Sequence, residues 1–323
     1  MAGNSALGTM FGAGSGAGSG AGGVETFMGI PRCRDLGRLP ARIALIGADG
    51  CTPYPSVGSY CAGGPGAIRA AGAAYAANLA HVDFDLGGPV FPGAVDAVDA
   101  GDLPQDDADP AGNRARIFGA VSQVLDRGGV PLLLGGDDSL PIPMIEAFGA
   151  RGRSYTILQI DAHIDWRDEV GGERLGLSST MRRASEMGHV EAIVQLGSRG
   201  IGSAREADLR DALDWGVEFV PAGEVARDGV WRAVDLIAPG SEVIICLDLD
   251  ALDPTVMPAV IGRTAGGLSY WQVLELIGGV AEKARIAGID MVEFMPGRDI
   301  DGMGAMVAAQ LLAAVMGIVA RQG

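Results

Sequence analysis

The chain has 323 residues, a length that allows a large hydrophobic core in one or two domains. Its formal net charge of −16 argues against nucleic acid as a partner, because polyanion binding requires a basic surface. Four cysteines without Cys-x-x-Cys spacing, and an N-terminus without a signal-peptide pattern, predict a cytoplasmic protein with reduced thiols and no membrane association.

Residues 1–26 are predicted to form a mobile tail, and the folded domain is expected to cover residues 27–323. Gly12 to Gly23 consists almost entirely of Gly, Ala and Ser, which offer little side chain to bury. The domain is expected to begin with a buried strand at residues 42–47 and a helix from Pro65 to about Ala80. The run His-Val-Asp-Phe-Asp at residues 81–85 fits an edge strand, which we favour, or a second set of metal ligands.

Strands and helices are expected to alternate through the rest of the chain. Asp109 and Pro110 form a good helix start, and Gly128–Gly129 ends that helix. Strands are expected at residues 130–134, 157–160, 192–196, 218–220, 243–247 and 289–292. Further helices are expected at residues 179–187, 203–216, 269–288 and 303–320, with capping boxes at Ser203–Glu206 and Ser269–Gln272. The apolar last helix is expected to be buried or to face another subunit.

This alternation predicts a single-domain, three-layer α/β/α fold with a central parallel sheet. Acidic residues and one histidine directly follow four of the expected strands: Asp138; Asp161, His163 and Asp165; Asp248 and Asp250; and Glu293. Because ligands bind at the carboxyl ends of parallel strands, we expect these side chains to converge. In an extended Asp161–Asp165 segment, alternate side chains would also point to the same side.

Converging carboxylates repel one another unless cations neutralise them. Oxygen-rich ligation with one imidazole suits Mn²⁺, and bridging carboxylates allow two ions to share the site. By itself, the Asp161–Asp165 segment would equally suit a solvated strand end. The other acidic residues favour the metal site.

Three segments resemble, in order and spacing, the signatures of the ureohydrolases, a family that includes arginase, agmatinase and guanidinobutyrase. They are Gly135–Ser139 (GGDDS), Asp161–Asp165 (DAHID) and Asp248–Pro254 (DLDALDP). Residues 60–69, which end in GPGAIR, and residues 266–268 and 292–296 resemble further elements of the family. The resemblance covers roughly residues 40–320 and is strongest to the agmatinase branch. It implies an arginase-like fold and a binuclear-metal hydrolase that converts a guanidino compound to urea and an amine. It also implies a homo-oligomer, either a hexamer or a trimer.

The resemblance assigns six side chains as ligands of two Mn²⁺ ions per chain: Asp138, Asp161, His163, Asp165, Asp248 and Asp250. Asp161 and Asp248 would bridge both ions. Asp138 and Asp165 would complete the shell of one ion, and His163 and Asp250 that of the other. Ni²⁺ or Co²⁺ would also suit these ligands, since availability and geometry select among such ions as much as ligand type does.

The resemblance also assigns catalytic and substrate-binding roles. Asp165 would accept a hydrogen bond from the attacking hydroxide, and Glu293 would pair with the substrate guanidinium. Arg167 and Arg182 are candidates to bind a substrate carboxylate, and a plain surface role is the alternative for both.

Two positions depart from the family pattern. The family usually has His at the position of Asp138, and Leu177 stands where a His usually passes a proton to the leaving amine. Leucine cannot transfer a proton. These departures support an alternative function, a catalytically weakened subunit that forms a hetero-oligomer with an active paralogue. Hydrolysis of an alkylated guanidine or a formimino group is a third possibility. Retention of the other ligands and of Glu293 favours catalysis on a guanidino substrate.

Overall fold

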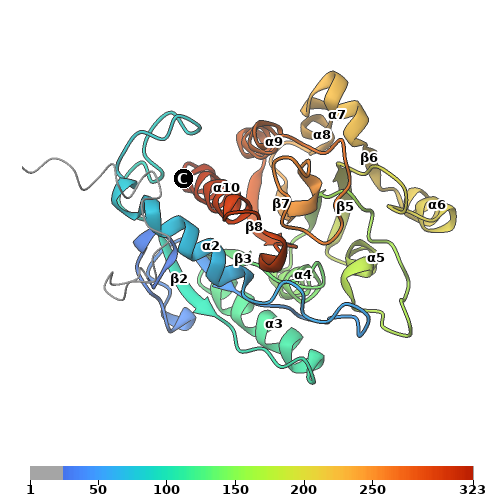
Figure 1. The fold of residues 1–323 in the computed structure, drawn as a ribbon, viewed down its shortest axis with the longest axis horizontal. Helices are drawn as coiled ribbons and strands as arrows, with labels where there is room; N and C mark the ends of the chain where they lie inside the picture. Colours follow the sequence, from blue (N-terminus) through green and yellow to red (C-terminus); the bar gives the residue numbers. More distant parts are fainter. Residues whose placement is uncertain (1–24, 323) are drawn as a thin grey trace, which may run out of the picture.

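The computed structural model describes residues 25–322, so the predicted tail at residues 1–26 lies almost wholly outside the described residues. Its centre is a parallel sheet of eight strands (Figure 1). The strands are β1 (Ile43–Gly47), β2 (Ala97–Asp102), β3 (Val130–Leu134), β4 (Tyr155–Ile160), β5 (Val190–Leu196), β6 (Glu218–Val220), β7 (Glu242–Asp248) and β8 (Arg285–Val292). Their spatial order is β2-β1-β3-β8-β7-β4-β5-β6.

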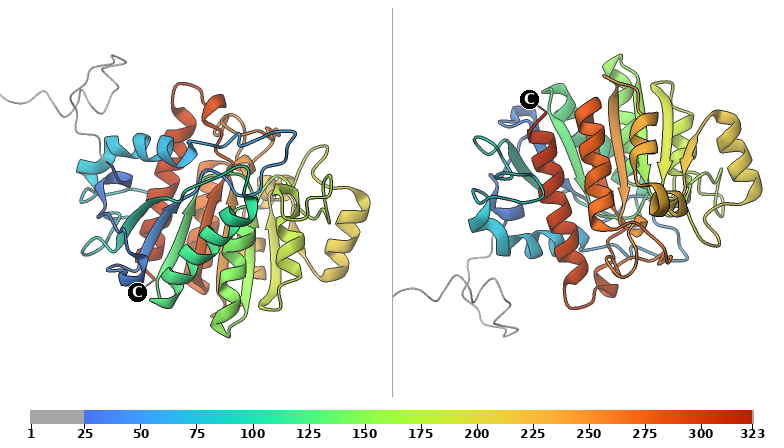
Figure 2. Two further views of the ribbon diagram at one scale, coloured as in Figure 1. Left: turned by 90° about the horizontal axis from the view of Figure 1, so that it is seen from below. Right: turned by 90° about the horizontal axis from the view of Figure 1, so that it is seen from above.

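Helices cover both faces of this sheet, as the two views in Figure 2 show. One layer contains α2 (Gly64–Gly72), α7 (Ala222–Asp228), α8 (Trp231–Leu236), α9 (Tyr270–Lys283) and α10 (Met303–Ala320). The other contains α3 (Pro110–Asp126), α4 (Pro141–Phe148) and α5 (Thr180–Ser185), with α6 (Glu206–Trp215) at the β6 end. Alternate residues of β1 belong to different cores: Ile43 and Leu45 belong to the core that includes α9 and α10, while Ala44 and Ile46 belong to the core that includes α3 and α4. The predicted three-layer α/β/α fold is confirmed.

The strand order explains how distant segments of the chain meet. β7 and β8 lie between β3 and β4, with Leu134 beside Met291, Val292 beside Asp248, and Leu247 beside Ile160. The carboxyl ends of β3, β8, β7 and β4 are therefore neighbours at one edge of the sheet. These are the four strands that the acidic residues follow.

Some expected elements differ from the structure. The capping box at Ser203–Glu206 was a wrong prediction, because α6 begins at Glu206 after Arg205 and the Ser203 hydroxyl instead donates to the carbonyl of Arg199. The helix expected to end at Gly288 already ends at Lys283, and Gly288 lies within β8. A side chain at Gly288 would approach the Phe148 ring to 2.7 Å, so this glycine allows α4 to pack closely on the strand. The Ser269–Gln272 capping box is confirmed.

Helix α10 forms part of the core. By length and composition it is the one helix within residues 25–322 that could cross a membrane, but 67% of it is buried inside the molecule. It packs against the sheet beside α9 and α2 (Figure 2). The expectation of a buried last helix is confirmed.

Arg69 joins α2 to β2 through a buried ion pair. Its guanidinium donates to both Asp99 oxygens, from Nε to Oδ2 at 2.8 Å and from the second terminal nitrogen to Oδ1 at 3.0 Å. Asp99 also accepts hydrogen bonds from the backbone N–H groups of Phe27 and Gly101, each at 2.8 Å. Removing the arginine would leave a buried carboxylate without its counter-charge.

We therefore expect Arg69→Met to lower the free energy of unfolding by about 3–5 kcal/mol, the usual cost of breaking a buried pair. The control is Arg210→Met, which removes an exposed pair with Glu206 and is expected to cost less than about 1 kcal/mol. Urea unfolding followed by circular dichroism measures both. Equal losses in the two variants would contradict this role for Arg69.

Candidate active site

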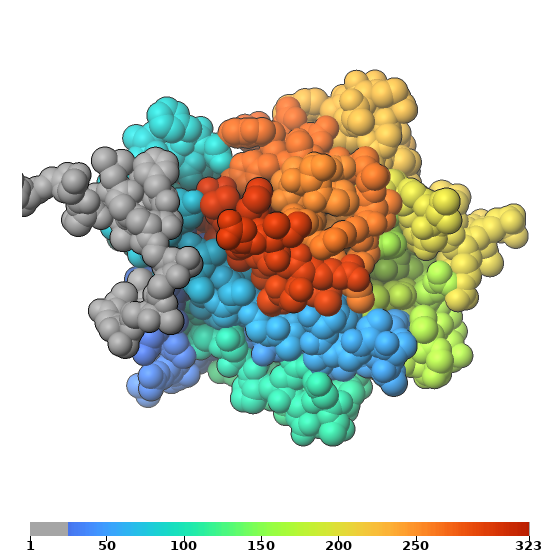
Figure 3. All heavy atoms as spheres, in the orientation of Figure 1, coloured from blue at the N-terminus to red at the C-terminus, as the bar shows by residue number. Residues whose placement is uncertain are grey.

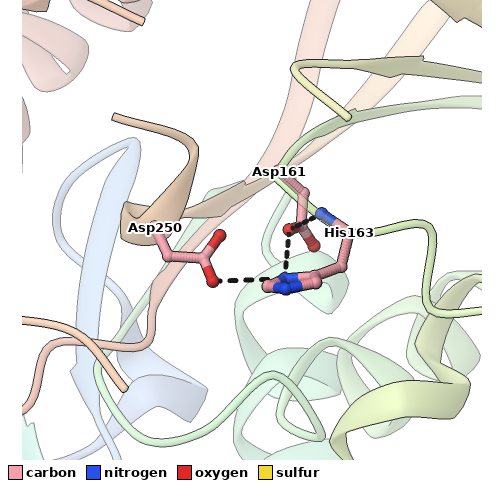
Figure 4. Close-up of side chains that lie close together, drawn as sticks. All are labelled: Asp161, His163 and Asp250. Atoms are coloured by element: carbon pink, nitrogen blue, oxygen red, sulfur yellow. Dashed lines mark hydrogen bonds and ion pairs between the residues drawn. The ribbon is translucent and has the colours of Figure 1, made fainter. Parts of the chain in front are cut away.

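Four acidic residues and one histidine form two groups of potential metal ligands at the carboxyl edge of the sheet. One group contains Asp138, Asp161 and Asp248, and the other contains Asp161, His163 and Asp250. Within each group, one ligand atom from each residue lies within 4.8 Å of the others. Asp161 belongs to both groups, so its carboxylate lies where it could bridge two ions. Figure 4 shows the second group, with the His163 ring between the two carboxylates.

A turn, rather than an extended strand, places His163 beside Asp161. β4 ends at Ile160, and the His163 N–H donates to Asp161 Oδ1 at 2.6 Å. The His163 ring returns toward the cluster, with Nδ1 3.4 Å from Asp161 Oδ1 and 3.2 Å from Asp250 Oδ2. The expected extended Asp161–Asp165 segment is therefore wrong, although its side chains do converge.

A hydrogen bond of the same kind, from a backbone N–H to the aspartate two residues earlier, shapes the segment after β7. The Asp250 N–H donates to Asp248 Oδ1 at 2.7 Å, and Asp250 Oδ1 accepts a bond from the Ala162 N–H at 3.3 Å. The Arg199 guanidinium fixes this loop by donating to the carbonyls of Asp250 at 2.8 Å and Ala251 at 3.0 Å. Sequence reasoning missed Arg199, because its partners are backbone carbonyls in a distant segment.

Asp165 lies outside both groups of ligands in the described part of the chain, but it is tied to Asp161. Gln159 Nε2 donates to Asp161 Oδ2 and to Asp165 Oδ2, each at 2.7 Å. Gln195 on β5 contacts Gln159 Oε1 and donates to the Ile164 carbonyl at 2.9 Å. Sequence reasoning also missed Gln159. The feature that could have revealed it is a single amide side chain between the apolar residues Leu158 and Ile160.

The adjacent residues Asp137 and Asp138 have different surroundings. Asp137 Oδ1 accepts a hydrogen bond from the Ser139 N–H at 3.0 Å and serves the local turn. Asp138 Oδ2 is buried and has no hydrogen-bond partner within residues 25–322. A buried oxygen in that condition is costly unless another group compensates it, and a cation at the cluster would do so.

Burial and neighbouring charges shift the acidity of the cluster. Burial and the surrounding carboxylates raise the pKa of Asp138, Asp165 and Asp248 well above the usual range. Although burial acts against it, hydrogen bonding to His163 lowers the pKa of Asp161. Burial likewise opposes the rise at His163, but contacts with Asp161 and Asp250 bring its pKa to about 12. The cluster thus favours positive charge, which divalent cations can supply.

A cavity of about 280 Å³ opens onto this cluster. Its lining includes Leu177 and the acidic residues and histidine of the site: Asp138, His163, Asp165, Asp248, Asp250 and Glu293. Arg167 lies on the wall, where its Nε is 3.4 Å from Asp208 Oδ2. Among the described residues that line the cavity, Arg182 is not found; it pairs with Asp211 and lies 3.6 Å from Glu186.

Residues 81–85 do not join the ligand groups found in residues 25–322. Asp83 forms an isolated bridge with Gly88 instead of an edge strand, and Asp85 Oδ2 accepts a hydrogen bond from the Tyr270 hydroxyl at 2.8 Å. The alternative set of metal ligands is therefore not assembled.

Comparisons with known proteins agree with this geometry. The sequence model of the arginase family matches residues 41–317. The N(1)-aminopropylagmatine ureohydrolase of Thermococcus kodakarensis is 30% identical over 289 residues, which cover 88% of this chain and 92% of that protein. The mitochondrial arginase 1 of Arabidopsis thaliana is 34% identical over 66% of this chain, but the match spans only 64% of the plant protein. The structure of proclavaminate amidino hydrolase from Streptomyces clavuligerus superposes with a TM-score of 0.76 at 27% identity, covering 93% of this chain and 98% of that chain.

We expect Mn²⁺ to stabilise the folded protein more at about pH 8 than at about pH 5.5, because raised carboxyl pKa values make the cation-free fold bind extra protons. Burial raises the pKa of Asp290 to about 7 and that of Glu293 to about 8, compared with about 4 in the unfolded chain. The folded, cation-free protein therefore loses stability as the pH rises from about 4 to about 8. Binding of the cation offsets that loss. Melting temperatures with EDTA and with MnCl₂ measure the effect, and an equal increment at both pH values would contradict it.

Proposed function

We propose that this chain, which belongs to the arginase family, hydrolyses a guanidino compound to urea and an amine. The observation that carries the proposal is the buried carboxylate of Glu293 on the same cavity as the ligand cluster. A carboxylate beside a two-metal site suits a planar cationic substrate. The names of the relatives, a ureohydrolase, an arginase and an amidino hydrolase, support this class of reaction.

We propose that six side chains hold two divalent cations: Asp138, Asp161, His163, Asp165, Asp248 and Asp250. Asp161 and Asp248 would lie between the ions. With Asp138 in place of a histidine, one ion would be surrounded by carboxylates alone, which favours the hard cation Mn²⁺ over Ni²⁺ or Co²⁺. When bound, the two ions lower the pKa of a water molecule and so supply a hydroxide nucleophile at neutral pH.

The protein side chains then orient the substrate and transfer the proton of the nucleophile to the leaving group. Glu293 accepts hydrogen bonds from the guanidinium and places its central carbon in the cavity. Asp165 accepts a hydrogen bond from the nucleophile. Attack on that carbon gives a tetrahedral intermediate, which collapses to urea and the amine. Because Leu177 cannot donate a proton, we assign delivery of the proton to the leaving amine to Asp165, which lines the same cavity and would receive that proton from the nucleophile.

We propose that Arg167 and Asp208, which also line the cavity, select the substrate. Arg167 could bind a substrate carboxylate only if its ion pair with Asp208 opens. The Asp208 carboxylate would then be available to an ammonium group of the substrate. Arg182 is already paired with Asp211, so we favour Arg167 for this role. We further propose a cytoplasmic homo-oligomer, a hexamer or a trimer. A hetero-oligomer with a paralogue is the alternative.

Urea release across a panel of agmatine, guanidinobutyrate, arginine, guanidine and alkylguanidines tests the activity. Asp248→Asn is expected to abolish turnover and to lower the metal content, because it removes charge from a carboxylate that would hold the cations. The control is Asp253→Asn in the same segment, whose carboxylate accepts hydrogen bonds from Gly266 and Thr255 instead of joining the cluster. It is expected to keep both metal ions.

Metal analysis separates the competing functions. A wild-type chain that binds two ions but releases urea from no compound would favour the partner-subunit role. A chain that cannot be loaded with metal would exclude the proposed hydrolase, and an unchanged rate in Asp248→Asn would show that the ligands are misassigned.

Leu177→His is expected to raise kcat at least about tenfold for substrates with a poor amine leaving group, because an added general acid typically contributes 10²–10⁴-fold. Leu177→Met, which keeps the wall apolar, is the matched control and should leave kcat close to that of the wild type. Steady-state urea assays measure both. Equal rates in the two variants would show that proton supply does not limit this enzyme.

A further inference from the structure

We propose that Tyr60 is a positioning residue that holds Glu293 with one carboxylate oxygen free for the substrate guanidinium; this inference rests on the proposed function. The Tyr60 hydroxyl donates a hydrogen bond of 2.5 Å to Glu293 Oε1. The two residues come from distant parts of the chain, since Tyr60 precedes α2 and Glu293 follows β8. The segment that contains Tyr60 lies against the C-terminal elements on the surface shown in Figure 3.

The two oxygens of Glu293 have different surroundings. Oε1 accepts two hydrogen bonds, from the Tyr60 hydroxyl and from the Asp138 N–H at 2.9 Å. Oε2 is buried and has no hydrogen-bond partner within the described residues. A buried carboxylate oxygen needs a donor, and a guanidinium offers several. The arrangement therefore leaves Oε2 as the acceptor for the substrate and reserves Oε1 for the protein.

The backbone of Glu293 has an unusual conformation and is held by a hydrogen bond to another segment. Its φ of +68° lies in the left-handed region, which residues other than glycine rarely adopt. The Glu293 N–H donates to the Gly136 carbonyl at 2.8 Å, which fixes the backbone but leaves the side-chain torsions free. Tyr60 and the Asp138 N–H are the donors that fix the carboxylate itself. Of the two, only the Tyr60 contact can be removed by substitution without changing a metal ligand.

The segment before α2 holds Tyr60 in place. The Gly64 N–H donates to the Cys61 carbonyl at 2.9 Å, and the Gly63 N–H donates to Asp49 Oδ1, also at 2.9 Å. A side chain at Gly64 would come within 3.2 Å of the Phe294 carbonyl, so this glycine allows the start of α2 to pack directly on the residue after Glu293. Burial raises the pKa of the Tyr60 phenol, so its hydroxyl keeps the proton that it donates.

Tyr60→Phe removes only the hydroxyl and tests the inference. We expect KM for the preferred guanidino substrate to rise about tenfold, the scale of one hydrogen bond to a charged group, while kcat changes less than about threefold. The metal content should stay at the wild-type value. The matched control is Tyr270→Phe, which removes a hydroxyl that donates to Asp85 at 2.8 Å outside the cavity and should leave both constants unchanged.

Calorimetric titration with guanidinium chloride separates this inference from the proposed function. If the wild type releases no urea, the proposed hydrolysis fails, but weaker guanidinium binding by Tyr60→Phe than by Tyr270→Phe would still support the positioning role. Equal guanidinium affinity in the wild type and Tyr60→Phe would overturn it. An unchanged KM in Tyr60→Phe, or no guanidinium binding by the wild type, would also overturn it.

Discussion

Mutual repulsion among buried carboxylates is the constraint on which the rest of this structure depends. Five aspartates and Glu293 are buried at the carboxyl edge of one sheet, where burial and then neighbouring charges raise the pKa of most of them. Such a cluster is stable only if protons or cations compensate it. The sheet contributes rigidity, because β7 and β8 lie between β3 and β4 and bring four strand ends together. Backbone N–H donors, Gln159 and Arg199 hold Asp161, Asp248 and the Asp250 loop in place.

Much of this arrangement could be predicted from local patterns. Apolar runs identified the buried strands, and the acidic residues after them located the site, because parallel strands end at the same edge. β2 was missed because Ala97–Asp102 contains two aspartates and a glycine and resembles a loop. It pairs with β1 in the sheet, and its buried Asp99 is neutralised by Arg69, a partner 30 residues away. Local propensity could not show that pairing.

Two of the three residues that sequence reasoning missed, Tyr60 and Arg199, act on partners in distant segments. Tyr60 and Glu293 are 233 residues apart, and Arg199 reaches carbonyls about 50 residues further along the chain. Gln159 is close to its partners in sequence, but it lies in a strand where every neighbour predicts a hydrophobic side chain. Ligands follow short motifs because they must leave the sheet at fixed positions. The groups that orient these ligands can come from any element that packs nearby, so no sequence spacing identifies the orienting groups.

The two departures from the family pattern act together. Asp138 adds a negative charge to the cluster and Leu177 brings no titratable group to the cavity wall, so the site depends more strongly on compensating cations. The proton of the nucleophile must then stay close to where it is released. In the mechanism that we propose, Asp165 keeps this proton, because Gln159 ties Asp165 to Asp161 and Asp165 lines the cavity.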